Sequence, residues 1–213
     1  MMVGIDNIGV RVGVVADTHC PEFLEKLPDS LFGALAGVDL ILHAGDVNGA
    51  ETIQRLSAVA PVEAVLGDHD RGLDLPLVRR LEVAGRRVAI LHGNRSRLYE
   101  EPLTFLGTVT LGRLWLAPGL QQWLRRQAPD ADVIVYGHTH APKITRLEGA
   151  LIFNPGAVYQ VDRAAADARL ARGPGWFEWT WLQFMRRRRR RLSPSVGILT
   201  FTADRVDAEI VLI

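Results

Sequence analysis

The feature that most constrains the fold is a repeated pattern of short apolar runs, rich in valine, each of which stops at aspartates or histidines. In the first part of the chain these runs cover residues 10–16, 38–42 and 62–66. Their length suits strands, and their continuous apolar character is typical of strands buried on both faces. Residues 29–35 and 51–59 lie between them and carry helix signals. This alternation predicts an α/β fold built on a parallel sheet with helices on both of its sides.

The second half of the chain contains further strands in a less regular order, and a helix is expected over residues 115–126. Two hairpins are expected, residues 143–153 and residues 195–213, because in each a short turn sequence separates two apolar runs. The predicted strands of this half are residues 78–83, 87–91, 132–136, 143–147, 151–153, 195–202 and 206–213.

Length and composition are those of a globular protein. The 213 residues, 48% hydrophobic and 23% charged, can bury a substantial core and exclude a wholly disordered chain. Cys20 is the only cysteine, which excludes an intramolecular disulfide and fits a reducing compartment. No targeting segment and no run of about 18 apolar residues is recognised. We therefore expect a cytoplasmic protein with a single domain over residues 1–213 and an insertion at about residues 162–194.

All six histidines lie at or near the carboxyl end of a predicted strand, and four aspartates accompany them. Loops at this edge of an open α/β sheet converge on one crevice, where sites form. A single histidine at a strand end is more often a hydrogen-bonded loop residue than a ligand, but the same arrangement in five loops predicts a shared site. The residues are His19, His43, His69, His92, His138 and His140, with Asp17, Asp46, Asp68 and Asp70.

Gathered carboxylates repel one another unless cations are present, so the cluster predicts bound metal. About seven candidate ligands exceed the three or four of one catalytic zinc site and fit two ions that share a bridging carboxylate. Mixed imidazole and carboxylate ligands favour manganese, iron, zinc or nickel over calcium, and manganese is our first choice. In an extended chain, residues two apart point to the same side. Such pairs are Asp17 with His19, Asp68 with Asp70, and His138 with His140.

Five sequence blocks, in this order and spacing, resemble those of the calcineurin-like metallophosphoesterases. They are Asp17-Thr-His19, Gly45-Asp46, Gly67-Asp68-His69-Asp70, His92-Gly93 and Gly137-His138-Thr-His140. The likeness runs from about residue 10 to residue 158 and resumes in the last hairpin. It is greatest to the small bacterial and archaeal phosphodiesterases, whose fold a retromer subunit also uses. The resemblance implies an α/β sandwich of two β-sheets flanked by helices, with the site at the carboxyl ends of the strands.

The resemblance also implies which residues act. A metal-bridging water, its pKa lowered toward ~7 to give a metal-bound hydroxide, would attack phosphorus in line. His69 would donate a proton to the leaving oxygen, and Asp70 would orient and charge that imidazole. One ion would be held by Asp17, His19 and His140, the second by Asp68, His92 and His138, and Asp46 would bridge both.

One position departs from the family, whose third block usually reads Gly-Asn-His-Asp. Asp68 is expected still to ligate, but its added negative charge favours a phosphodiester over the more highly charged monoester. His43 is expected to brace the site through hydrogen bonds rather than to ligate, and Cys20 to be a packed neighbour of the site.

The segment Trp176–Arg191 has the most unusual local composition, WFEWTWLQFM followed by six arginines. These arginines bring the formal net charge to +1, and without them the chain would be acidic. Three interpretations remain open for this segment. It packs on the domain or across a homo-oligomer, it binds a membrane surface, or it binds nucleic acid.

The sequence as a whole predicts an enzyme that hydrolyses a phosphoester, a phosphodiesterase with two divalent ions. A non-catalytic interaction scaffold of the same fold is the first alternative. A nuclease or a lipid-directed phosphatase, guided by the segment Trp176–Arg191 and associated with a membrane in the second case, is the other.

Overall fold

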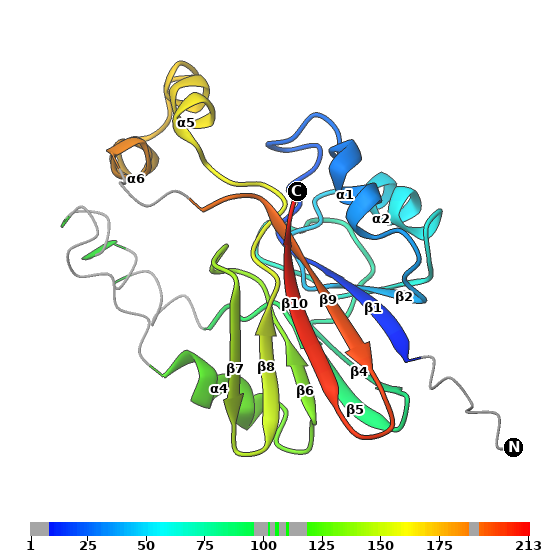
Figure 1. Cartoon of the computed structure of the whole chain (residues 1–213). Helices are drawn as coiled ribbons and strands as arrows, with labels where there is room; N and C mark the ends of the chain where they lie inside the picture. Colours follow the sequence, from blue (N-terminus) through cyan, green and yellow to red (C-terminus); the bar gives the residue numbers. More distant parts are fainter. Residues whose placement is uncertain (1–8, 96–101, 103–104, 107–109, 111–118, 188–191) are drawn as a thin grey trace, which may run out of the picture. The chain divides into compact units, whose positions relative to one another are not determined.

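The computed structural model describes residues 9–95, 102, 105–106, 110, 119–187 and 192–213 (Figure 1). The chain divides into two compact units. The first contains the described residues up to Gly93, then Gln121–Tyr159 and Pro194–Ile213, and the second contains those of Asn94–Leu120 and Gln160–Ser193. The 162–194 segment thus groups with residues 94–120, and its description as an insertion into a single domain stays a prediction.

The first unit holds two mixed five-stranded sheets, as the predicted sandwich requires. One has the order β10-β9-β1-β2-β3 and the other β4-β5-β6-β8-β7 (Figure 1). In the first sheet the strands are β1 (Val10–Val15), β2 (Leu40–His43), β3 (Val62–Ala64), β9 (Ser195–Phe201) and β10 (Val206–Leu212). In the second they are β4 (Val78–Val83), β5 (Arg86–Leu91), β6 (Val133–Val135), β7 (Lys143–Leu147) and β8 (Ala150–Asn154).

The register of the parallel strands places their carboxyl ends side by side. Val15 of β1 pairs with His43 of β2, which in turn pairs with Ala64 of β3. In the second sheet Ile90 of β5 pairs with Val135 of β6 in the same parallel sense. The loops that leave β1, β2 and β3 therefore start from one row, and those that leave β5 and β6 start from another.

Strand β1 is buried on both faces, but by different partners. Val12 and Val14 belong to a core that includes residues of both sheets, among them Phe153 and Phe201. Val15 belongs to a second core with side chains of the helices α1 (Asp29–Ala34) and α2 (Ala50–Ser57). The expectation of helices on both sides of the first sheet is wrong, because a second sheet covers one face, and an apolar run cannot distinguish these two coverings.

Most predicted elements occur within one or two residues of their expected limits. The helix expected over residues 115–126 appears as α4 (Leu120–Gln127), and residues 115–118 lie outside the described ones. The two-sheet fold with flanking helices is confirmed.

The second unit contains helices α5 (Arg163–Leu170) and α6 (Trp176–Arg187), which pack on each other. Asp162 caps α5 by accepting a hydrogen bond from the backbone nitrogen of Ala165 at 2.7 Å. Arg169 of α5 donates twice to Glu178 of α6, at 3.1 and 2.6 Å. Among the described residues, no helix combines the length and apolar character needed to cross a bilayer.

Candidate metal centre

The aspartates and histidines predicted to ligate metal come together in the first unit, at the carboxyl ends of five strands. Asp17 and His19 follow β1, Asp46 follows β2, Asp68 follows β3, His92 follows β5, and His138 and His140 follow β6. They include two groups that share no residue, in each of which one ligand atom per residue lies within 4.8 Å of the others. Asp46 joins two further groups of this kind, one with His19 and His69 and one with Asp17 and His92. The inner group is Asp17, His19 and His140, and the outer group is Asp68, His92 and His138.

Within each group, the side-chain nitrogens and oxygens lie close to one another. His140 Nε2 lies 3.4 Å from Asp17 Oδ1 and also 3.4 Å from His19 Nε2. In the outer group, His138 Nδ1 lies 3.3 Å from Asp68 Oδ2. The ligand atoms of each group are therefore close enough together to share one cation.

Asp46 lies between the two groups. Its Oδ2 atom is 3.5 Å from His19 Nε2 of the inner group and 3.4 Å from His92 Nε2 of the outer group. Its Oδ1 atom is held separately, because it accepts a hydrogen bond of 2.9 Å from the backbone nitrogen of His69. One carboxylate oxygen is therefore fixed by the protein, and the other is directed toward both groups.

Burial differs sharply across the cluster. The side chains of Asp17 and His92 are fully buried and that of Asp46 is 5% exposed. Asp68 and His69 are 38% and 45% exposed. The cluster therefore has an enclosed floor and a side that is open to solvent.

The electrostatics of the enclosed floor are governed first by burial and then by contacts between aspartates and histidines. Burial raises the pKa of the Asp17 carboxyl and lowers the pKa of His19 to about 3. Burial would also raise the pKa of Asp46, but the neighbouring His92 and His19 hold it well below its usual range. Asp46 in turn raises the pKa of His92 although burial favours the neutral ring.

The residues present fit divalent ions. His92 Nδ1 lies 2.7 Å from the carbonyl oxygen of Ala44, and donation of its N–H to that oxygen would leave the Nε2 lone pair available to a cation. Within the described part of the chain, His92 Nε2 and Asp17 Oδ2 are both buried and have no hydrogen-bond partner. A buried unsatisfied acceptor is costly, and a cation would satisfy both atoms.

The ligand loops have an unusual backbone conformation. Asp17, His19, Asp46, His138 and His140 all have positive φ, between 46° and 64°. Aspartate and histidine adopt this region more readily than most residues, at a cost of about 1–3 kcal/mol each. The expectation that Asp17 and His19, or His138 and His140, align as extended residues is wrong. Left-handed turns separate them instead, and the Asp17 backbone nitrogen donates to Gly45 O and that of His19 to Asp46 O, both at 3.0 Å.

Two glycines of the sequence blocks leave room for ligands of other blocks. A Cβ atom on Gly67 would lie 2.2 Å from Asp46 Oδ1, and one on Gly137 would lie 2.9 Å from Asp17 Oδ2. Both distances are too short for any side chain. These glycines are therefore required by close packing around the carboxylates.

His69, the predicted proton donor, and Asp70, predicted to orient its ring, have different surroundings. The backbone of His69 contacts Asp46, and its ring lies edge-on to that of His19 with centroids 4.9 Å apart. Asp70 accepts backbone hydrogen bonds from Asn48 at 2.7 Å and Gly67 at 2.8 Å. The carboxylate found beside the His69 ring is that of Glu22, 3.2 Å from Nδ1.

Neighbours of the cluster are placed as follows. His43 is fully buried at the end of β2, with Nε2 3.2 Å from the hydroxyl of Thr18, and it belongs to neither ligand group. Cys20 is buried in the core between the first sheet and its helices.

Sequence reasoning missed Glu22 and Asn48, which lie near the cluster but not at strand ends. It also assigned no role to Asn154, which is buried and donates to the carbonyl oxygen of Gly137 at 2.7 Å. The amide thereby supports the loop that carries His138 and His140. An asparagine that ends a strand and precedes proline was the only available signal.

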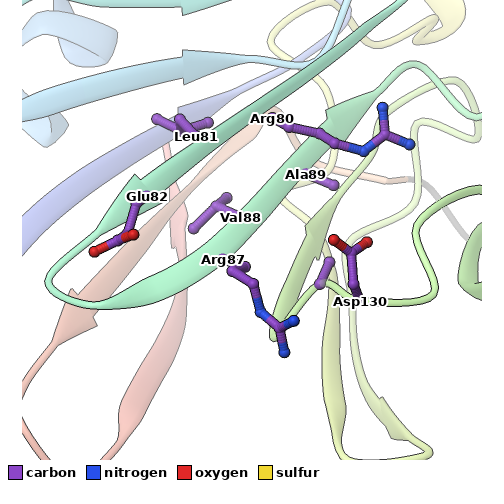
Figure 2. A pocket seen from close by; sticks show the side chains of 8 residues that line it. Arg80, Leu81, Glu82, Arg87, Val88, Ala89 and Asp130 are labelled. Carbon is purple, nitrogen blue, oxygen red and sulfur yellow. The ribbon is translucent and has the colours of Figure 1, made fainter.

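A separate cavity of about 260 Å³ is lined by residues of β4, β5 and the turn before β6 (Figure 2). Arg80, Arg87 and Asp130 are among its lining residues, and none of the lining residues belongs to the ligand groups. Arg87 already pairs with Asp132, with Nε to Oδ2 at 3.4 Å. The cavity does not contribute to the metal centre.

Comparison with known proteins places this geometry in a family. The model of the calcineurin-like phosphoesterase superfamily domain matches residues 10–170. The chain belongs to this superfamily. A probable metallophosphoesterase of Methanothermobacter thermautotrophicus is 34% identical over 176 residues, which cover 76% of this chain and 91% of the relative. The family is metal-dependent, in agreement with the ligand groups above.

Solved structures of low sequence identity share the fold. Vacuolar protein sorting 29 of Cryptosporidium parvum has a TM-score of 0.67 at 20% identity, over 97% of this chain and 92% of that one. Vps29 of Entamoeba histolytica, in complex with zinc, has a TM-score of 0.60 at 19% identity, over 95% of this chain and 98% of that one. At such identities the likeness concerns the fold alone.

Proposed function

We propose that this calcineurin-like phosphoesterase is a phosphodiesterase that uses two divalent ions, with manganese as the first choice. The observation that carries the proposal is the position of Asp46, whose Oδ2 atom faces His19 and His92 at 3.5 and 3.4 Å. One carboxylate oxygen between two ligand groups is the arrangement that a dinuclear site needs.

Each residue then has a defined task. Asp17, His19 and His140 would hold one ion, Asp68, His92 and His138 the other, and Asp46 would contact both. When bound, the ions supply Lewis-acid chemistry, activating water and neutralising phosphoryl oxygens. The buried floor keeps Asp17 and His92 dry, which strengthens their electrostatic interactions with ligands and substrate.

His69 is the proposed proton donor to the leaving oxygen. Its side chain is 45% exposed, so it stands on the open side of the cluster, where a substrate can reach it. Asp68 lies on the same side and is 38% exposed. Its extra negative charge, relative to the family's asparagine, disfavours a dianionic monoester more than a monoanionic diester.

The test is hydrolysis of bis-p-nitrophenyl phosphate by protein reconstituted with manganese, compared with the monoester p-nitrophenyl phosphate. We expect turnover of the diester, slower turnover of the monoester, and a loss of about 100-fold or more in His69→Ala. Absence of turnover with manganese, nickel, iron and zinc, together with unchanged behaviour of His69→Ala, would sink the proposal.

A non-catalytic scaffold is the second candidate, and the fold likeness to Vps29 proteins is the observation that favours it. A scaffold has no chemical need for an exposed histidine beside seven ligand-type residues. The same assay therefore separates the two candidates, because a scaffold would bind metal without diester turnover.

For helix α6 we propose contact with an anionic membrane surface. Trp176 and Trp179 are 69% and 50% exposed, and both would suit the interfacial region of a bilayer. Arginine residues that follow them in sequence would add attraction to anionic lipids.

Sedimentation with phosphatidylserine vesicles tests this proposal. Wild type should pellet with the vesicles, and the double variant Trp176→Ser/Trp179→Ser should remain in the supernatant. If both stay in solution, the proposal fails, and binding to single-stranded oligonucleotides instead would favour nucleic acid.

A further inference from the structure

The loop after β1 brings a second carboxylate to the open side of the cluster. Glu22 Oε2 lies 3.2 Å from His69 Nδ1, and the two side chains are 41% and 45% exposed. They are 47 positions apart in sequence, so the fold alone creates this pair. A carboxylate on one imidazole nitrogen fixes the ring's orientation and decides which nitrogen carries the proton.

Glu22 is itself held in place. The side-chain amide of Asn48 donates to Glu22 Oε2, the same oxygen that faces His69. Asn48 has a left-handed backbone, with φ of 67°, and its amide nitrogen also lies 3.5 Å from the carbonyl oxygen of His69. The asparagine thus ties Glu22 and the His69 loop together.

Asp70 is engaged elsewhere. Each of its oxygens accepts a backbone N–H, from Asn48 at 2.7 Å and from Gly67 at 2.8 Å. These bonds fix the loop that carries His69. The carboxylate that contacts the His69 imidazole is that of Glu22.

A competing task for Glu22 would be to brace the ligand His19. Its Oε2 atom lies 3.9 Å from His19 Nδ1, beyond hydrogen-bond distance, whereas the distance to His69 is 3.2 Å. The geometry therefore favours His69 as the partner.

We propose that Glu22 is the positioning residue of the proton donor, an inference that rests on the proposed phosphodiesterase function. Glu22 accepts the Nδ1–H of His69, so that Nε2 is the nitrogen that meets the substrate. As the bond from phosphorus to the leaving oxygen breaks, the Nε2 proton moves to that oxygen and the imidazole becomes neutral. The adjacent carboxylate keeps the ring oriented toward the leaving oxygen throughout this transfer.

The experiment compares two diesters that differ in the basicity of the leaving group, methyl p-nitrophenyl phosphate and methyl phenyl phosphate. p-Nitrophenolate leaves readily without a proton, whereas phenolate depends on one. In Glu22→Ala we expect kcat/KM to fall about 10- to 100-fold for the phenyl ester and no more than about threefold for the nitrophenyl ester. Glu22→Gln still offers an oxygen acceptor and should lose less. Glu25→Ala, an exposed glutamate of the same loop, is the matched control and should behave as wild type.

Two further measurements do not depend on turnover. Bound manganese per chain should be the same in wild type and Glu22→Ala. In metal-free protein, nitrogen NMR of the neutral His69 ring should show the tautomer with its proton on Nδ1 in wild type. In Glu22→Ala the two tautomers should be redistributed.

The outcomes separate this inference from the function on which it rests. Equal losses with both esters, or loss of bound metal in Glu22→Ala, would overturn the inference and assign Glu22 to His19. A leaving-group effect in His69→Ala without one in Glu22→Ala would also overturn it while leaving the proposed function intact. If His69→Ala shows no leaving-group effect, the proposed proton donor is wrong.

Discussion

The two ligand groups have the same composition, one aspartate and two histidines each, but their aspartates differ in exposure to water. Asp17 of the inner group is fully buried, whereas Asp68 of the outer group is 38% exposed. The histidines differ little, because each group has one buried histidine, His19 or His92, and one that is 26% exposed, His140 or His138. A buried aspartate is shielded from competing water, and an exposed one is not. If the two proposed ions bind, this difference predicts that the ion at Asp17 would be held more tightly than the ion at Asp68.

The largest effect on turnover is expected for substitution of Asp46, which lies between the two groups. Asp46→Ala removes the carboxylate shared by both, so diester turnover should fall by on the order of a thousandfold and both ions should bind more weakly. Calorimetric titration with manganese and the diester assay measure the two effects. Asp74→Ala, at an exposed position, is the control. Loss of only one ion in Asp46→Ala would contradict the bridging position.

The comparison itself is tested by the same substitution at the two aspartates. Asp17→Asn replaces a buried charge and should weaken inner-ion binding by more than about 100-fold, the upper end of effects seen for residues that merely support ligands. Asp68→Asn keeps a ligating oxygen and reduces the negative charge, so metal is retained and diester turnover is kept or raised. Complete loss of metal from Asp68→Asn would show that metal binding by the outer group depends on the charge of its aspartate as strongly as binding by the inner group does.

Two glycine substitutions should change the metal affinities of the two groups to different extents, while every ligand residue stays the same. Gly67→Ala crowds Asp46, with a Cβ 2.2 Å from Oδ1, and should weaken both ions, by about 10- to 100-fold. Gly137→Ala crowds Asp17 at 2.9 Å and should weaken mainly the inner ion. Competition with a chelator measures each affinity. Gly33→Ala in α1, where a Cβ meets nothing within 4 Å, is the matched control.

The smallest expected effect concerns acid stability of the metal-free protein. Burial lowers the pKa of His19, and likewise that of His43, to about 3 from the ordinary 6.5. Between pH 6.5 and 3 the unfolded chain therefore binds protons that the folded chain does not. Each of these histidines thus contributes stability above pH 6.5 that is lost as the pH falls, at up to about 1.4 kcal/mol per pH unit. Urea unfolding from pH 7 to pH 4 should show a shallower slope in His19→Gln, and an unchanged slope would contradict the buried, neutral state of His19.

Much of the fold and of the candidate site can be predicted from the sequence, because the positions of the strand ends can be predicted. Val10–Val15 and the other valine-rich runs mark the strands, and the register that aligns Val15, His43 and Ala64 then brings the following residues together. The covering of the first sheet was not readable, since an apolar face packs equally well on helices or on another sheet. The left-handed turns at Asp17 and His138 depend on hydrogen bonds between distant loops, and the pairing of Glu22 with His69 depends on the placement of two loops. Local pattern carries no signal for such contacts.

Each ligand group draws on both sheets of the sandwich. Asp17 and His19 extend from β1 of one sheet while His140 extends from β6 of the other, and the outer group is divided in the same way between Asp68 and the pair His92 and His138. Separation of the sheets would therefore dismantle both groups at once, so metal occupancy and global unfolding are thermodynamically linked. Each tenfold rise in free metal above its dissociation constant should add about 1.4 kcal/mol per ion to the free energy of unfolding. The melting temperature of this protein should consequently report the free metal concentration around it.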